Sequence, residues 1–165
     1  MPRTGRVEKR KTSPDLIYQN PLVTKLINKI MKEGKKTVAQ SIVYESFSKI
    51  KNSGKDPIET FEKAVDNATP KMEVRPRRVG GASYMVPMEV RGPRRQALAL
   101  NWLIAAARNR QLPELEDRPK NKPVMISKLS QELLDAANGE GGAVSKKQEM
   151  QRMADANKAF AHFRW

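Results

Sequence analysis

Residues 71–95 restrict the fold more than any other segment, because two alternating runs flank a glycine-rich break. The segment reads KMEVRPRRVGGASYMVPMEVRGPRR. Alternation with a period of two on both sides of such a break predicts a two-stranded β-hairpin over about residues 72–91. Pro76 and Pro87 have no N–H to donate, so we expect each where its backbone faces outward. The alternating apolar residues are Met72 and Val74 in the first run, and Tyr84, Val86, Met88 and Val90 in the second.

The predicted hairpin is strongly basic, with seven basic and two acidic residues in this segment. Arginine forks match phosphate oxygens two at a time, and small residues at the tip allow close approach of the backbone. Gly80 and Gly81 fit a turn better than a phosphate-binding loop, since the lysine and helix of that motif do not follow them. A basic ribbon of this kind favours a nucleic-acid partner. The basic residues are Lys71, Arg75, Arg77, Arg78, Arg91, Arg94 and Arg95.

Apolar residues recur at helical spacing on both sides of the hairpin. Asn20 and Asp56 can cap helices that begin at prolines, and the pair Ser145 and Gln148 forms a further capping box. Gly34 can close the first helix. The sequence therefore predicts a mostly α single domain of about six helices, with the hairpin protruding between the third and fourth. The expected helices cover 21–34, 38–53, 57–69, 92–110 and 123–138, with the last helix from 145 onward; the fourth is expected to be central.

The chain has 165 residues and a net charge of +14, with 38% hydrophobic residues. This length supports one core, which we place in residues 15–165, and the charge indicates a polyanionic partner. Residues 1–14 lack apolar periodicity, so we expect a flexible basic extension that orders on a phosphate backbone or only aids solubility. Its basic residues include Arg3, Arg6, Lys9 and Arg10.

Several chemistries are excluded or disfavoured by residue usage. The chain has no cysteine and one histidine, His162, which excludes disulfides and thiolate zinc sites. Glu59, Glu62 and Asp66 could hold magnesium, but a solvated helix face with Glu59 in a cap explains them better. We therefore expect no cofactor, no metal and no catalysis. No apolar run is long enough to cross a membrane, so a cytosolic location without a membrane partner is the expectation.

Five residues have two interpretations each. Tyr84 could stack on a base or steady the ribbon by cross-strand packing. Lys35 and Lys36 could contact phosphate or complement a helix C-terminus. Arg94 and Arg95 lie in the first turn of a helix, where cations oppose the helix dipole; this local conflict favours phosphate contact as the reason for them.

The chain resembles the bacterial family of small-subunit ribosomal protein seven. The matching stretches are MPRTGRVEKR at the start, NPLVTKLINKIMKEGKK at 20–36, PRRVGGASYMVPMEVRGPRRQALALNWL at 76–103 and ELLDAANGEGGAVSKKQEMQRMADANKAFAHFRW at 132–165. They cover most of the chain in the order of the family. One segment departs from the pattern: QLPELEDRPKNKPV is longer and more acidic than the turn expected there, so contacts at 113–123 cannot be carried over.

The resemblance implies six helices with a hairpin between the third and fourth, and a structural role in the small ribosomal subunit. It implies binding to the 3′ major (head) domain of small-subunit ribosomal RNA, nucleation of head assembly, and contact with neighbouring small-subunit proteins through the last helix. It also places the hairpin tip near the exit-site transfer RNA and the messenger RNA path, in the cytoplasmic ribosome. The implied RNA-contacting residues are Arg3, Arg6, Lys9, Arg10, Lys35, Lys36, Arg75, Arg77, Arg78, Arg91, Arg94 and Arg95, and the tip is Gly80, Gly81, Ala82, Ser83 and Tyr84.

Two other functions compete with this one. A DNA-bending architectural protein also inserts a basic β-arm with small residues at its end. That class usually places its arm late in a short chain, whereas about seventy residues follow the arm here. A magnesium-dependent nuclease would use Glu59, Glu62 and Asp66, and would lose cleavage on alanine substitution of all three.

Overall fold

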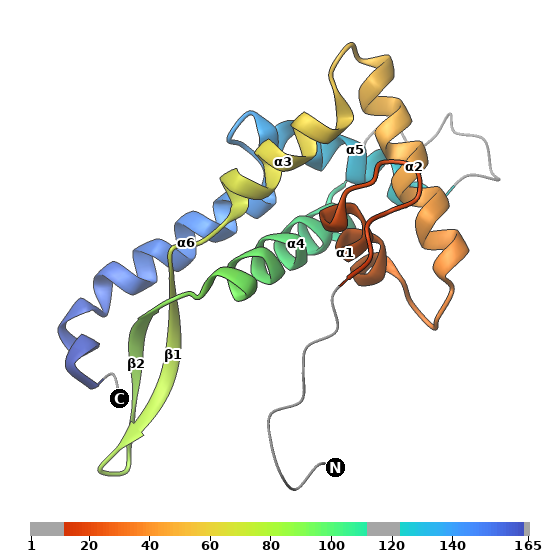
Figure 1. Cartoon of the computed structure of the whole chain (residues 1–165). Coiled ribbons are helices and arrows are strands. Elements are labelled where there is room, and N and C mark those ends of the chain that lie inside the picture. Colours follow the sequence, from red (N-terminus) through yellow and green to blue (C-terminus); the bar gives the residue numbers. More distant parts are fainter. Residues whose placement is uncertain (1–11, 112–122, 164–165) are drawn as a thin grey trace, which may run out of the picture.

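The computed structural model describes residues 12–111 and 123–163. Six α-helices, one hairpin and a final 3₁₀ helix follow one another in this part of the chain as a single domain (Figure 1). This confirms the predicted mostly α fold with a hairpin between the third and fourth helices. The elements are α1 (Pro21–Ile30), α2 (Lys36–Asn52), α3 (Pro57–Ala68), β1 (Met72–Val79), β2 (Ala82–Glu89), α4 (Gly92–Asn109), α5 (Val124–Ala137), α6 (Gly142–Ala156) and η2 (Lys158–Phe163).

The first and third helices begin where the sequence predicts. The Asn20 side chain accepts a hydrogen bond from the Leu22 N–H at 2.8 Å. Asp56 Oδ1 accepts bonds from the N–H groups of Ile58 and Glu59 at 2.7 and 3.2 Å. Each bond satisfies a donor that has no partner within its helix, so both caps define where their helices begin.

The end of α1 differs from the prediction. The helix stops at Ile30, and the Met31 N–H bonds the Ile27 carbonyl at 3.0 Å. Glu33 and Gly34 then adopt positive φ values of 55° and 74° in the turn that leads to α2. Gly34 therefore serves the turn between the helices and does not close α1.

The start of α6 corrects a second prediction. Ser145 lies inside the helix, which begins at Gly142, so the capping box at Ser145 and Gln148 was wrong. One N–H of the first turn is satisfied by a tertiary contact: Glu132 Oε1 of α5 accepts the buried Ala143 N–H at 3.0 Å. No local sequence rule predicts a cap that comes from another helix.

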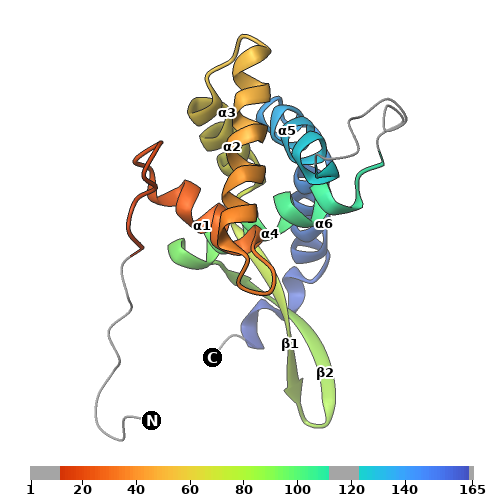
Figure 2. The ribbon, with the colours of Figure 1, turned by 90° about the vertical axis from the view of Figure 1, so that its right-hand side faces the viewer.

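The core lies between the helices and away from the hairpin. Helix α4 contacts α1, α3, α5 and α6, while α5 contacts α2, α3, α4 and α6, so α5 shares the central place predicted for α4 alone (Figures 1 and 2). Trp102 packs against this core and is partly buried. In the described ranges, no helix combines the length and the apolar character needed to cross a membrane. Fully buried side chains include Phe47, Phe61, Leu100, Leu103, Leu129 and Leu133.

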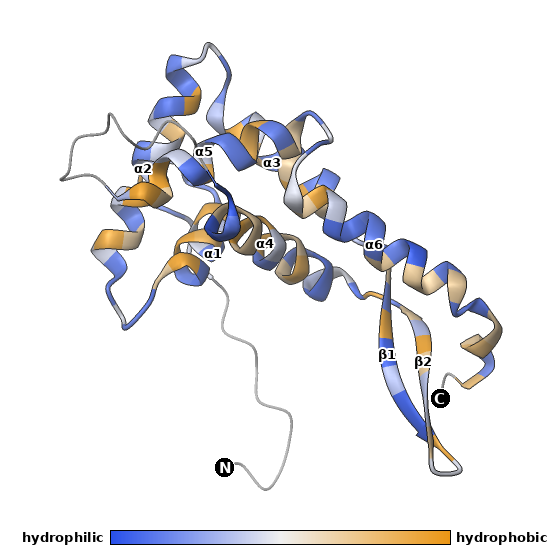
Figure 3. Cartoon of the chain, turned by 180° about the vertical axis from the view of Figure 1, so that it is seen from behind, coloured by the Kyte–Doolittle hydropathy of each residue, from blue (hydrophilic) through white to orange (hydrophobic). Residues whose placement is uncertain are grey.

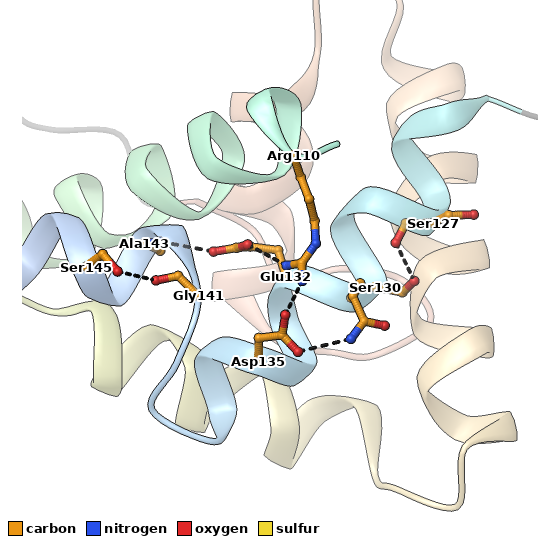
Figure 4. A network of polar contacts seen from close by, with 9 residues as sticks. Arg110, Ser127, Ser130, Glu132, Asp135, Gly141, Ala143 and Ser145 are labelled. Carbon is orange, nitrogen blue, oxygen red and sulfur yellow. Dashed lines mark hydrogen bonds and ion pairs between the residues drawn. The ribbon is translucent and has the colours of Figure 1, made fainter. Parts of the chain in front are cut away.

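A polar network joins the end of α4 to α5 and α6 (Figure 4). Arg110 Nη1 donates to Glu132 Oε2 at 2.8 Å, and Arg110 also pairs with Asp135. Glu132 is only 2% exposed, and its second oxygen caps α6 as described above. One buried carboxylate thus connects three helices, and its charge is balanced by Arg110.

The hairpin extends beyond the helices, and the C-terminal elements run beside it (Figures 1 and 2). Helix α6 contacts both strands, and η2 contacts β2. Figure 3 shows the distal part of β1 as hydrophilic, whereas α4 carries hydrophobic residues along much of its length. The distal part of β1 is therefore hydrophilic, and the hairpin is supported from one side by α6 and η2.

Candidate nucleic-acid interface

The hairpin has a two-residue turn and a regular register. Val79 pairs with Ala82, so only Gly80 and Gly81 lie between the strands. Their φ values are 56° and 90°. Two consecutive residues with positive φ are typical of the turns that fit the twist of a hairpin, and glycine adopts them without strain. The predicted turn is confirmed.

The register also accounts for the prolines. The Val90 N–H bonds the Lys71 carbonyl at 3.1 Å, and antiparallel pairs alternate between hydrogen-bonded and non-hydrogen-bonded positions. Counting from this pair, Pro76 and Pro87 both fall in non-hydrogen-bonded positions, opposite Met85 and Val74. Their missing N–H groups would have faced outward, as expected.

Pairing across the strands mixes charged and apolar residues on one face. Arg75 is opposite Val86 and Arg77 is opposite Tyr84. Directly opposite residues of an antiparallel pair share a face of the ribbon. The charged run of β1 therefore lies beside the apolar run of β2, and Val86 is fully buried while Arg75 and Arg77 are half-buried.

Glu73 holds two of the predicted RNA-contacting arginines at the base of the hairpin. Its carboxylate is buried and accepts bonds to Oε1 from Arg75 Nε at 2.6 Å and Arg75 Nη2 at 2.5 Å. Arg94 Nε of α4 lies 2.9 Å from Oε1 and 2.7 Å from Oε2. The side chains of Arg75 and Arg94 remain 43% and 51% exposed. The carboxylate thus joins β1 to the first turn of α4.

Arg95 also has partners within the chain. Its Nε donates to the Val90 carbonyl at 2.7 Å, and its Nη2 donates to Glu89 Oε1 at 3.0 Å. Arg91 occupies the cap position before α4 and is exposed. A hollow lies between the hairpin and α4, and the residues that line it are Glu73, Arg75, Met88, Glu89, Arg91, Pro93, Arg94 and Ala97.

These contacts change how the arginines of the first turn are explained. Arg94 and Arg95 oppose the positive end of the helix dipole, but carboxylates of Glu73 and Glu89 lie beside them. The local conflict is therefore compensated inside the molecule, and by itself it no longer indicates phosphate. RNA contact by Arg94 and Arg95 stays a prediction that rests on their charge, exposure and position.

Tyr84 lies against the C-terminal segment. Its ring centroid is 5.2 Å from Phe160 and 5.2 Å from Phe163, both in η2. The ring therefore packs on η2, a tertiary contact that neither interpretation expected. Sequence reasoning missed Phe160 and Phe163, and their spacing near Tyr84 could not be known before the fold. Base stacking by Tyr84 stays a prediction.

Lys35 and Lys36 lie apart from the hairpin. Lys35 precedes α2, its Nζ bonds Glu33 at 2.7 Å, and Lys36 is the first residue of α2. Lys35 shares a groove with Arg108, near the end of α4, whereas the hairpin joins the start of that helix. The 18 residues of α4 span about 27 Å at 1.5 Å per residue. The two predicted groups therefore lie toward opposite ends of α4. Lys25 and Lys29 of α1 lie between them, bonded to Gln96 and Asn101 of α4 at 3.0 and 2.7 Å.

The remaining residues singled out in the sequence are those of the N-terminal extension, the divergent segment and the possible magnesium site. Arg3, Arg6, Lys9, Arg10 and most of the divergent segment 113–123 lie outside the described part of the chain. Within residues 12–111 and 123–163, no group of three acidic or histidine side chains could hold a metal ion. Glu59 pairs with Lys63 at 2.6 Å, and Glu62 Oε1 accepts a bond from Asn20 Nδ2 at 2.8 Å.

The described residues form a helical domain with a protruding, arginine-rich hairpin that α6 and η2 support. The model of one protein family, described as ribosomal protein S7p/S5e, matches residues 2–158. The chain belongs to this family. It is therefore a structural constituent of the small ribosomal subunit, is not an enzyme, and has its place in the cytoplasmic ribosome. Ribosomal RNA binding, the expected partner class, fits this membership.

Relatives in the family match over their whole length. Small ribosomal subunit protein uS7 from Carboxydothermus hydrogenoformans is 53% identical over 166 aligned residues, covering 100% of both chains. The proteins of the same name from Caldicellulosiruptor bescii and Caldicellulosiruptor saccharolyticus are 52% and 51% identical with the same coverage. Full-length similarity at this level decides against the DNA-bending protein and the nuclease.

Proposed function

We propose that the chain binds the 3′ major (head) domain of small-subunit ribosomal RNA through two groups of basic residues. The hairpin region comprises Arg75, Arg77, Arg78, Arg91, Arg94 and Arg95, and the interhelical region comprises Lys35 and Lys36. The observation that carries the proposal is that these arginines lie together on β1 and at the first turn of α4, where a carboxylate joins the two elements outside the core.

The exposed arginines retain donors for phosphate. A guanidinium carries five N–H donors in a planar fork. Arg94 uses Nε for its bonds with Glu73, and Arg95 uses Nε and Nη2 for its bonds with Val90 and Glu89. Both side chains are partly exposed, at 51% and 35%. Each can therefore bind an outside acceptor without leaving its partner in the chain.

Two basic regions at opposite ends of α4 suit a folded RNA. Each region binds phosphates without reading sequence, but the fixed distance between them selects RNA whose backbone segments have the same separation. Recognition of this kind is expected for a protein that binds ribosomal RNA early and nucleates assembly of the head. The basic extension at residues 1–14 would add phosphate contacts beside these two regions.

The ends of the hairpin and of the chain are proposed to face other partners. The tip residues Gly80 to Ser83 are exposed, and Tyr84 packs on η2 behind them. We place this tip near the exit-site transfer RNA and the messenger RNA path. The outer surface of α6 and η2 would contact neighbouring small-subunit proteins. Met153 of α6, which is 38% exposed, would supply an adaptable apolar contact there.

Competition binding across a salt series tests the proposal. The purified protein is titrated with a head-domain fragment of small-subunit ribosomal RNA, with bent duplex DNA and an unrelated structured RNA as competitors. We expect the fragment to win by orders of magnitude and to keep its preference at high salt. If all three bind alike and lose affinity together, charge alone explains the binding, because the counterion contribution depends on phosphate contacts and not on shape.

A further inference from the structure

The carboxylate of Glu73 is an unexpected feature in a surface made for phosphate. It is 5% exposed, while the two arginines bound to it are about half exposed. A negative charge in such a surface lowers the general attraction for RNA. It also requires compensation, because a carboxylate removed from water is stable only when it is paired and hydrogen-bonded. Arg75 and Arg94 provide this compensation.

The contacts with Glu73 orient the side chains of Arg75 and Arg94. Arg94 reaches both oxygens of Glu73 through Nε alone, at 2.9 and 2.7 Å. Arg75 approaches Oε1 through Nε and Nη2, at 2.6 and 2.5 Å. Long arginine side chains lose rotamer freedom when they bind, and this loss weakens binding unless the side chains are already ordered. A shared buried anchor orders two of them at once, one from β1 and one from α4.

We propose that Glu73 is a positioning residue for RNA recognition, which holds Arg75 and Arg94 as one preorganised pair of guanidinium groups. Glu73 does not touch RNA itself. Its negative charge reduces the affinity for any polyanion. The fixed pair of guanidinium groups binds phosphates only where two of them have the matching separation, so the binding becomes more selective among RNAs. This inference rests on the proposed RNA-binding function.

The substitution Glu73→Gln separates the two effects because it keeps the shape and removes the charge. We expect its affinity for an unrelated structured RNA to rise about twofold, with a salt dependence steeper by at most about one unit. Its preference for the head-domain fragment over that RNA should fall roughly tenfold, as two side chains become free to reorient. A merely structural residue would not change the two affinities in opposite directions.

Glu59→Gln is the matched control. It makes the same change of charge on α3, where the Glu59 side chain is 64% exposed and forms an ion pair with Lys63. The control should raise binding to both RNAs alike and leave the preference unchanged. Arg94→Lys is the complementary variant, because lysine keeps the charge but not the planar fork. It should lose preference without gaining affinity for the unrelated RNA.

Whether the side chains of Arg75 and Arg94 are ordered can be measured without RNA. In nitrogen-edited NMR spectra, the Nε–H signals of Arg75 and Arg94 should exchange slowly with water in the wild type and rapidly in Glu73→Gln. Thermal unfolding reports separately whether the variant is folded. Should Glu73→Gln fail to fold, Arg94→Lys carries the test, since its substituted side chain is half exposed.

The outcomes distinguish this inference from the function on which it rests. If the wild type binds both RNAs alike, the proposed function fails and the role of Glu73 fails with it. If the wild type discriminates and Glu73→Gln discriminates equally well, only the role of Glu73 is overturned. A loss of preference in Glu73→Gln and Arg94→Lys, with none in Glu59→Gln, supports it.

Discussion

Glu132 of α5 accepts a hydrogen bond from the Ala143 N–H of α6 at 3.0 Å, and thereby supplies the cap that α6 does not have in its own sequence. The same carboxylate pairs with Arg110 at 2.8 Å. It adds a polar connection between the end of α4 and α6, the helix that runs beside the hairpin. A residue outside the hairpin thus helps to hold the helix that supports it.

Glu132→Ala should destabilise the fold by about 2 kcal/mol, because it leaves the buried Ala143 N–H without its acceptor and removes one of the two carboxylates that pair with Arg110. The midpoint of chemical denaturation measures the loss. Glu149→Ala is the control on exposed α6, where the pair with Lys146 should contribute less than about 0.5 kcal/mol. Equal effects of the two substitutions would contradict the capping role.

Gly141→Ala should cost more than Gly139→Ala. Both glycines have positive φ, 93° and 86°, so an added Cβ strains the backbone at either position. At Gly141 that Cβ would also lie 3.1 Å from Glu132 Oε1, whereas at Gly139 nothing lies within 4 Å. The difference between the two unfolding free energies isolates the contact with Glu132. A cost at Gly139 equal to that at Gly141 would show that only φ matters.

The stability of the fold should decline at alkaline pH through Tyr44. Burial, together with a hydrogen bond to Asp15, raises the pKa of Tyr44 from 10.0 to about 12. Because the folded-state pKa is above the unfolded one, this stabilisation is complete below pH 10 and is lost as the pH rises from 10 through about 12. Ultraviolet absorbance of tyrosinate should show one group titrating near 12. Tyr44→Phe should remove this titration, and its persistence would assign it elsewhere.

Phe160→Ala should loosen the hairpin without unfolding the core, since it removes one of the two η2 rings that lie 5.2 Å from the ring of Tyr84 in β2. A double-mutant cycle with Tyr84→Ala should give a coupling of about 1 kcal/mol. Hydrogen exchange of β2 amides should quicken in each single variant. Additive effects in the cycle would mean that the two rings do not stabilise each other.

Replacing Arg77 and Arg78 by alanine should weaken binding to the head-domain fragment and reduce the salt dependence by roughly one unit per lost phosphate contact. Both arginines lie in β1 near the tip. Lys51→Ala with Lys55→Ala removes the same charge from the exposed α2–α3 turn and should change the slope little. An unchanged slope for the arginine variant would remove this part of the hairpin from the interface.

The residues near the hairpin show which features could be predicted from the sequence and which could not. Alternation and the two glycines predicted both strands and the turn, because these depend on neighbours in the chain. The burial of Glu73 and the contact of Tyr84 with Phe160 were not predictable, since each joins segments far apart in sequence. Arg94 and Arg95 were identified as exceptional, but the reason seen in the structure is a pair of carboxylates inside the chain.

The sequence by itself determined the helices, their caps at Asn20 and Asp56, the hairpin and the family, because these follow from local propensity, periodicity and shared motifs. The tertiary structure alone decided where α6 begins, that α5 shares the centre with α4, and that the hairpin arginines and Lys35 lie toward opposite ends of α4. The physical reason is that caps from other helices, buried ion pairs and distances between surfaces arise only when remote segments pack together.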